Sequence, residues 1–149
     1  MEFNVTVELI PETSIYDNLR KVVKKSVWDK LRKQTYKDYN HSCGKCGGKE
    51  GILDCHELWE FDDKKNIQKL SGLVAVCRMC HLIIHHGRAN MLVAEGVLDK
   101  EELIKHFLKV NHCTRQDYEI HVKEAFVLWK QRSQKEWVVD LGEYQQYTV

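Results

Sequence analysis

The sequence has one proline, Pro11, and no apolar run that approaches the roughly 20 residues needed to cross a bilayer. Its start lacks a basic segment followed by an apolar stretch of about 7–15 residues, so we expect no secretory signal. The 23 lysines and arginines nearly balance 22 aspartates and glutamates, so the formal net charge is only +1. Any affinity for nucleic acid must therefore come from a local patch. We expect a cytoplasmic protein that is not inserted in a membrane.

Four of the six cysteines form two Cys-x-x-Cys pairs, about thirty residues apart. Zinc prefers thiolate ligands in tetrahedral geometry, and two ligands three residues apart on a tight turn can face one metal ion. The pairs therefore predict one structural zinc ion per chain, with no open coordination position. Disulfide bonds are the alternative, but that pattern is typical of short secreted chains. The predicted zinc ligands are Cys43, Cys46, Cys77 and Cys80.

The N-terminal part is predicted to contain a strand and a long helix. Residues 2–10 alternate apolar and polar side chains up to Pro11, as strands do. From Ile15 to Tyr39, apolar residues recur at spacings of three and four, which indicates an amphipathic helix, interrupted near Ser26. Its other face is basic, and it is either a solvated surface or a surface that follows a phosphate backbone. The basic residues are Arg20, Lys21, Lys24, Lys25, Lys30, Arg32, Lys33 and Lys37.

The segment between the two cysteine pairs is predicted to form a hairpin. Residues 52–59 and 67–76 have the composition of strands, and the polar residues 62–66 between them are typical of a turn. A short helix is expected to begin at His81 and to end at Gly87. These elements connect the second cysteine pair directly to a helix.

Two further helices are expected in the C-terminal part. Asp99 and Glu102 have the spacing of a capping box for a helix that reaches Val110. Residues 116–134 carry apolar side chains at helical spacing and form the last helix. Aromatic side chains of this kind and unpaired cysteines are usually buried, so we expect core positions for six residues. These are Trp28, Trp59, Trp129, Trp137, Cys55 and Cys113.

Three histidines lie near the cysteine pairs in the sequence. His81 and His85 are four residues apart, so they lie on one face of a helix, and His56 comes from the predicted hairpin. If the cysteines join hairpin and helix, the three imidazoles can hold a second metal ion, or two can hold it while the third acts as a base. The alternative is that they are surface residues or hydrogen-bonded core residues.

These motifs together resemble the HNH endonuclease family. The resemblance is carried by Cys43-x-x-Cys46, by Leu53-Asp54-Cys55-His56-Glu57, and by Gly72 to Cys77 followed by x-x-Cys80-His81-x-x-x-His85. It covers residues 41–88. It implies a ββα-metal finger braced by a zinc knuckle. We therefore predict an α+β fold and a single domain over residues 1–149, with a strand and a basic helix in 1–40 and helices in 89–149.

The resemblance also implies which residues act. A divalent ion (magnesium, manganese or zinc) would bind at His56, His81 and His85, with His81 as the helix ligand of the family. The strand motif can be aligned with the family in two registers. In one register Cys55 stands where relatives carry an acidic residue or a histidine, and His56 is the general base. In the other register His56 is a metal ligand and Glu57 is the base.

The expected partner is DNA, cleaved at phosphodiester bonds, and family members also act as homodimers. Candidate phosphate contacts are Lys24, Lys25, Arg32, Lys33, Lys45, Arg78 and Arg88. The alternative function is a catalytically inactive zinc-binding module that binds nucleic acid or a protein partner.

Overall fold

The computed structural model describes residues 2–149 and shows a mixed α+β fold built around a three-stranded sheet. Strands β1 (Asp54–Asp62) and β2 (Ile67–Val76) form an antiparallel hairpin, and β3 (Val138–Asp140) pairs in parallel with the other edge of β2. The predicted hairpin is therefore confirmed. Its turn follows from Asp62, whose Oδ1 accepts the N–H groups of Lys64 and Lys65 at 3.0 Å each. Strand β1 is an edge of the sheet.

A register shift in the hairpin decides which side chains share a face. Leu58 pairs with Gly72 and Trp59 pairs with Leu70, so Ser71 is an extra residue on β2. A bulge of this kind reverses the alternation of side chains along a strand. Beyond it, His56 pairs with Val74, on one face, while Glu57 pairs with Leu73, on the other.

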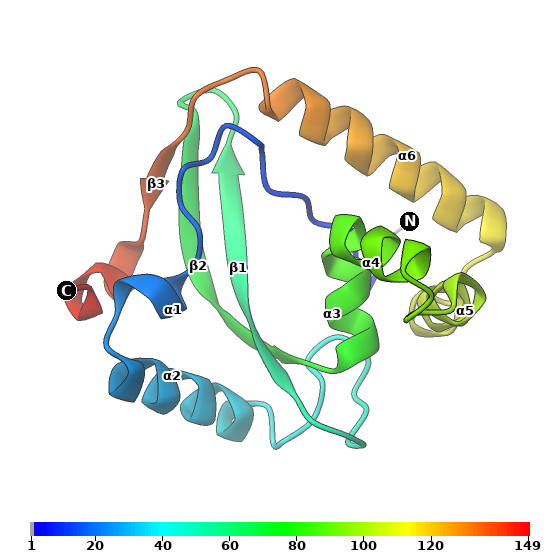
Figure 1. Ribbon diagram of the computed structural model, residues 1–149, viewed down its shortest axis with the longest axis horizontal. Coiled ribbons are helices and arrows are strands. Elements are labelled where there is room, and N and C mark those ends of the chain that lie inside the picture. The colour runs from blue at the N-terminus through cyan, green and yellow to red at the C-terminus, as the bar shows by residue number, and fades with distance from the viewer. Residues whose placement is uncertain (1) are drawn as a thin grey trace.

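One face of the sheet is covered by the N-terminal helices (Figure 1). These are α1 (Leu19–Val22) and α2 (Lys25–Asp38), together with the 3-10 helix η1 (Gly142–Tyr147). A small core of Leu19, Trp28 and Leu70 lies between them and the strands. The predicted interruption of the helix is present, at Val23 and Lys24.

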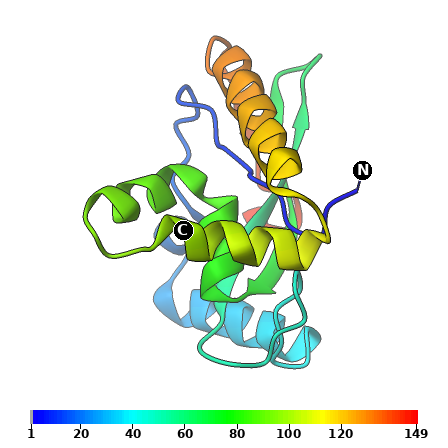
Figure 2. The ribbon, with the colours of Figure 1, turned by 90° about the vertical axis from the view of Figure 1, so that its right-hand side faces the viewer.

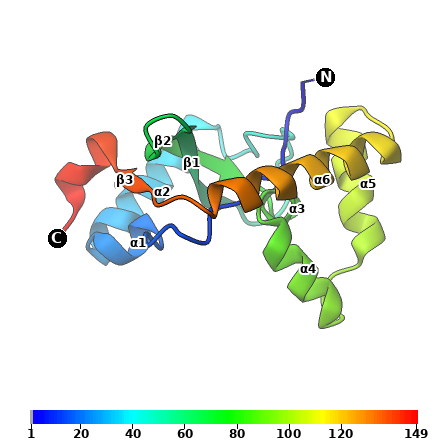
Figure 3. The same ribbon diagram turned by 90° about the horizontal axis from the view of Figure 1, so that it is seen from above.

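The larger core lies on the other face, beneath α3 (Arg78–Ile84) and α5 (Lys100–Asn111). Seen from above, α1 and α2 lie to one side of the strands and α3, α4 and α5 to the other (Figure 3). Helix α4 is His86–Ala94 and α6 is Arg115–Arg132. Figure 2 shows α6 rising beside the hairpin while α5 crosses in front of α3.

The predicted end of the short helix at Gly87 is wrong. Helix α3 begins at Arg78, with Cys77 as its N-cap, and ends at Ile84. The chain then bends at His85, and Gly87 lies inside α4. A glycine weakens a helix but does not end it when the backbone stays helical.

The caps of the last two helices also differ from the prediction. Asp99 does cap α5, but its carboxylate accepts the N–H of Glu101 and not that of Glu102. The capping box is at α6, between Thr114 and Asp117. Both predicted helices are nevertheless present.

The predicted N-terminal strand is absent, because residues 2–10 pair with no strand. The N–H groups of Asn4 and Val5 donate to Oδ1 of Asn111, and Val7 N–H donates to Nε2 of His121. This extended segment, with its alternating burial, is therefore held by side chains of α5 and α6. The pattern of alternation is the same as in a strand, but the hydrogen-bond partners are side chains.

Of the four tryptophans, Trp28 and Trp137 are buried as predicted, whereas Trp59 and Trp129 are partly buried. Cys55 and Cys113 are also only partly buried. Within residues 2–149, no helix has both the length and the apolar character required to cross a membrane.

Replacing Asn111 by alanine is predicted to lower the free energy of unfolding by about 2–3 kcal/mol, because two backbone N–H groups lose their acceptor. Urea denaturation measures this. The matched control is Asn90→Ala, at an exposed position, with an expected change below about 0.5 kcal/mol. Equal losses in the two variants would contradict the role given to Asn111.

Candidate metal sites

Four cysteine sulfurs converge where the hairpin meets α3. The ligand atoms of Cys43, Cys46, Cys77 and Cys80 all lie within 4.8 Å of one another. The sulfurs of Cys46 and Cys77 are 3.8 Å apart, which is close to the separation of about 3.8 Å that tetrahedral Zn–S bonds of about 2.3 Å require. All six cysteines are free thiols, so the disulfide alternative is wrong. The four cysteines could bind a metal ion such as zinc.

Each cysteine pair lies on a turn whose N–H groups point at sulfur. Cys43 Sγ accepts from the N–H groups of Lys45 and Cys46 at 3.4 and 3.5 Å, and Cys77 Sγ accepts from Cys80 N–H at 3.4 Å. Such bonds stabilise negative charge on sulfur. The turns are thus suited to thiolates, the form in which cysteine binds a metal.

Two glycines allow the first turn to form. Gly47 has a φ of 76°, in the left-handed region that most side chains avoid. Gly44 donates its N–H to the carbonyl of Ala75 at 2.7 Å, which joins the turn to β2. A Cβ at Gly44 would meet side-chain atoms of Val74 and Tyr39 at 2.6 Å, so any other residue would force these side chains to move.

A histidine that the sequence analysis did not identify also contacts the sulfurs. His106 Nε2, from α5, lies 3.2 Å from Sγ of Cys80 and 3.9 Å from Sγ of Cys77. An N–H donor at this place would stabilise a metal-bound thiolate. Because His106 is 26 residues from Cys80, the sequence carries no spacing signal for it.

Hydrogen bonds among the four cysteines shift the pKa values of their thiols in opposite directions. Hydrogen bonds from the thiols of Cys77 and Cys80 lower the pKa of Cys43 well below its usual range. The same bonds raise the pKa of Cys80. A cation at the centre of the cluster would remove this competition, since metal ligation deprotonates all of its thiols.

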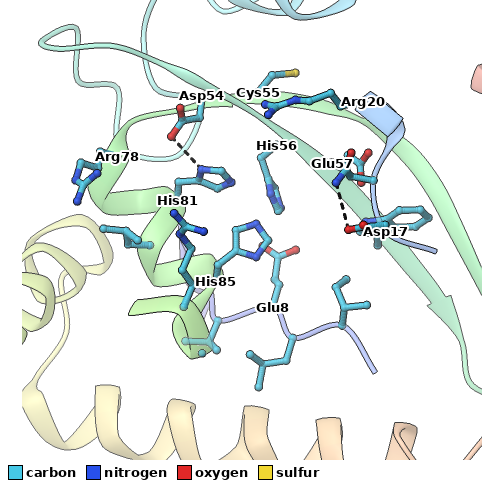
Figure 4. A pocket seen from close by; sticks show the side chains of 18 of the residues that line it. Glu8, Asp17, Arg20, Asp54, Cys55, His56, Glu57, Arg78, His81 and His85 are labelled. Carbon is cyan, nitrogen blue, oxygen red and sulfur yellow. Dashed lines mark hydrogen bonds and ion pairs between the residues drawn. The ribbon is translucent and has the colours of Figure 1, made fainter. Parts of the chain in front are cut away.

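The second cluster consists of the three histidines. Ligand nitrogens of His56, His81 and His85 lie within 4.8 Å of one another. His56 comes from β1, His81 from α3 and His85 from the bend that follows α3, and their rings face one another (Figure 4). His56 is buried, and its Nε2 has no hydrogen-bond partner among residues 2–149. This geometry suits a divalent ion held by imidazole nitrogens.

Asp54 orients one of these histidines. Its Oδ2 lies 3.0 Å from Nδ1 of His81 (Figure 4). A carboxylate that holds one ring nitrogen leaves the other free for a metal ion, an arrangement common at metal sites. Asp54 lies within the motif that resembles the HNH family, but the sequence alone assigned it no role. Its position two residues before His56, on the same face of β1, was the available signal.

The surroundings keep two of the histidines neutral. Burial lowers the pKa of His56 to about 3, with the neighbouring His85 and His81 as further causes. Burial also lowers the pKa of His85 to about 4. Neutral imidazoles are the form that binds metals.

Glu57, the base in one of the two predicted registers, points to the other face of the hairpin from His56. Its Oε1 accepts hydrogen bonds from the backbone N–H of Leu19 and from the hydroxyl of Tyr16. Neighbouring residues of a strand point to opposite faces, and His56 faces α3. Cys55 shares the face of Glu57 and is no ligand of the histidine cluster.

A groove of about 1220 Å³ passes over the histidines and the free edge of β1. Five arginines line it. Within residues 2–149, three of them form an ion pair or lie over an aromatic ring. Arg20 lies over the ring of Trp28, Arg32 bonds Asp29, and Arg132 bonds Asp63. The other two are Arg78 and Arg88, beside the histidines.

The predicted phosphate contacts are only partly gathered there. Arg32, Arg78 and Arg88 line the groove, whereas Lys24, Lys25 and Lys33 are exposed and do not. Helix α2 covers the face of the sheet opposite α3. Its outer lysines therefore belong to a separate surface.

Comparisons of this chain with protein-family models, with curated proteins and with solved structures found no significant match.

Replacing Cys43 by serine is predicted to reduce the metal held by the four cysteines from one ion per chain to a small fraction of that. Stability falls by several kcal/mol, since structural zinc contributes about 10–16 kcal/mol in zinc-finger peptides. Elemental analysis and thermal denaturation measure both effects. The control is Cys113→Ser, outside the cluster, which keeps the ion. Full metal content in the Cys43 variant would refute the four-cysteine site.

Protein with no ion at the histidines is predicted to lose stability as pH falls from about 6.5 toward the folded pKa of His56, about 3. Unfolded His56 takes up a proton in this range while folded His56 does not, so acid favours unfolding. Urea denaturation at about pH 7 and pH 5 measures the slope. In His56→Gln the free energy of unfolding should depend less steeply on pH. Equal slopes in the variant and the wild type would contradict the low pKa assigned to His56.

Proposed function

We propose that this protein is a metal-dependent endonuclease of the HNH type, which hydrolyses phosphodiester bonds of DNA. The observation that carries the proposal is the convergence of His56, His81 and His85 directly beside a four-cysteine cluster. A structural metal alone would not require three imidazoles, largely withdrawn from solvent, on adjoining elements.

The arrangement of elements supports the resemblance seen in the sequence. A hairpin followed at once by a short helix, with one cysteine pair at the junction, is what a ββα-metal finger requires. We assign one structural zinc ion to the four thiolates. Magnesium, manganese or zinc would bind at the histidines, and of these three ions zinc is the one that imidazole ligands favour.

A divalent ion at the histidines would supply Lewis-acid stabilisation of the phosphate and of the leaving 3′ oxygen. The chain's own residues arrange the site. His56, His81 and His85 present ring nitrogens to the ion, and Asp54 fixes the ring of His81. Oxygen from water bonds to phosphorus while the P–O3′ bond breaks, which leaves a 5′ phosphate and a 3′ hydroxyl. Because His56 belongs to the cluster, we assign it as a ligand and not as the base.

DNA is the proposed substrate because of the charge along the groove. Arg78 and Arg88 stand next to the histidines, and no acidic side chain among residues 2–149 forms an ion pair with either. Guanidinium groups free of internal partners can bind phosphate oxygens in a bidentate manner. Contacts of this kind position a duplex without reading its sequence.

One observation favours the second candidate, an inactive zinc-binding module that binds nucleic acid or a protein partner. Glu57, the strand residue that could have acted as base, holds the start of α1. A site without a strand base could retain the fold and lose the chemistry. This candidate predicts one metal ion per chain and none at the histidines.

Supercoiled plasmid is predicted to be nicked by the zinc-loaded protein on addition of Mn²⁺, Mg²⁺ or Zn²⁺. His56→Ala and His81→Ala should each reduce the rate at least ~100-fold, because each removes an ion ligand. Agarose gels and metal analysis are the readouts.

The control for these variants is His112→Asn, at an exposed position where asparagine tolerates the left-handed backbone. Cleavage that persists in both alanine variants would come from a contaminant and would refute the proposal. No cleavage with any ion, together with one metal per chain, would establish the inactive module.

A further inference from the structure

The segment before Pro11 is fixed against the helices that surround the histidines. Val7 N–H donates to Nε2 of His121 at 2.9 Å, and Glu8 N–H donates to the carbonyl of Ile84 at 3.0 Å. Ile84 is the last residue of α3 and directly precedes His85. Glu8 is therefore held beside the histidine cluster by the backbone of the same helix that carries His81.

The carboxylate of Glu8 points into the groove toward the imidazoles. Figure 4 shows it beside the ring of His85. Its Oε2 is enclosed and has no hydrogen-bond partner among residues 2–149. No lysine, arginine or histidine in that part of the chain forms an ion pair with it. An enclosed carboxylate oxygen without a partner is costly, so this position calls for a cation.

The histidine cluster lacks a negatively charged ligand for a bound cation. Three imidazoles bring no negative charge, and Nε2 of His56 is enclosed without a partner among residues 2–149. A divalent ion bound only by them would carry its full charge in a largely enclosed groove. The other nearby carboxylates are engaged, since Asp54 bonds His81 and Glu57 bonds Leu19 on the far face.

We infer that Glu8 supplies the carboxylate ligand of the divalent ion held by His56, His81 and His85. The inference rests on the proposed metal site and adds a residue from outside the 41–88 motif. Glu8 stands next to the tight group of imidazoles and is not a member of it. The site is thus completed by a segment distant in sequence, and its oxygen ligand favours harder ions such as Mn²⁺.

Titration with Mn²⁺ tests this in protein whose cysteines are already loaded with zinc. The electron paramagnetic resonance signal of free Mn²⁺ reports binding without any assay of activity. Glu8→Gln should weaken Mn²⁺ binding about 10–100-fold. Glu12→Gln, the same change at an exposed position of the same segment, should leave the affinity within about twofold. His81→Ala should abolish binding.

The melting temperature of the protein without Mn²⁺ separates a ligand from a structural residue. Glu8→Gln removes an enclosed charge that has no partner, so this temperature should stay equal or rise. A clear fall would mean that Glu8 stabilises the fold, which would overturn the inference.

Two further outcomes would also overturn it. Unchanged Mn²⁺ affinity in Glu8→Gln, with binding lost in His81→Ala, would reject Glu8 and leave the three-histidine site intact. Absence of Mn²⁺ binding in the wild type would overturn the inference as well, whereas the proposed nuclease is decided separately by plasmid nicking with Mg²⁺ or Zn²⁺.

Discussion

The convergence of four cysteine sulfurs is the constraint on which the rest of the structure depends. One pair follows α2 and the other joins β2 to α3, so their meeting fixes the helix relative to the hairpin. The bond from Gly44 N–H to the carbonyl of Ala75 adds a backbone link at the same point. Once α3 is fixed, His81 and His85 can only face the side of β1 that carries His56. The histidine cluster is therefore a geometric consequence of the cysteine cluster.

Side chains alternate between the two faces of the sheet along residues 54–57 of β1, so these four residues have two different structural roles. Asp54 and His56 point toward α3, where they belong to the histidine site, whereas Cys55 and Glu57 point toward α1 and α2. Glu57 provides a carboxylate for the free N–H of Leu19 at the start of a helix, where a negative charge is favourable. The same short segment thus builds the metal site on one face and anchors the N-terminal helices on the other.

Charge acts locally in this protein and not through the whole molecule. The net charge is close to zero, yet the groove beside the histidines is lined by arginines. Salt links and stacking occupy three of them, which leaves Arg78 and Arg88 next to the candidate site. A concave surface concentrates the field of such charges, so the proposed phosphate binding depends on this groove and not on the net charge. The lysines on the outer face of α2 lie outside that groove.

Local patterns in the sequence determined much of this fold. Cysteine spacing identified the four clustered thiols, strand composition identified the hairpin, and apolar periodicity identified α2 and α6. The expected cap at Asp99 identified α5. His56, His81 and His85 were also found from spacing, because an i,i+4 pair next to a cysteine pair leaves few places for the rings to go. These features depend on neighbours in the chain, so the sequence carries them directly.

Tertiary structure alone decided the rest. Residues 2–10 alternate like a strand, but pairing requires a partner edge, and Asn111 and His121 provided acceptors in its place. The bulge at Ser71 and the direction of Glu57 depend on how two strands are aligned. His106 and Glu8 reach the two clusters from segments far away in the sequence. Contacts of this kind arise only when distant elements pack together, and no spacing along the chain encodes them.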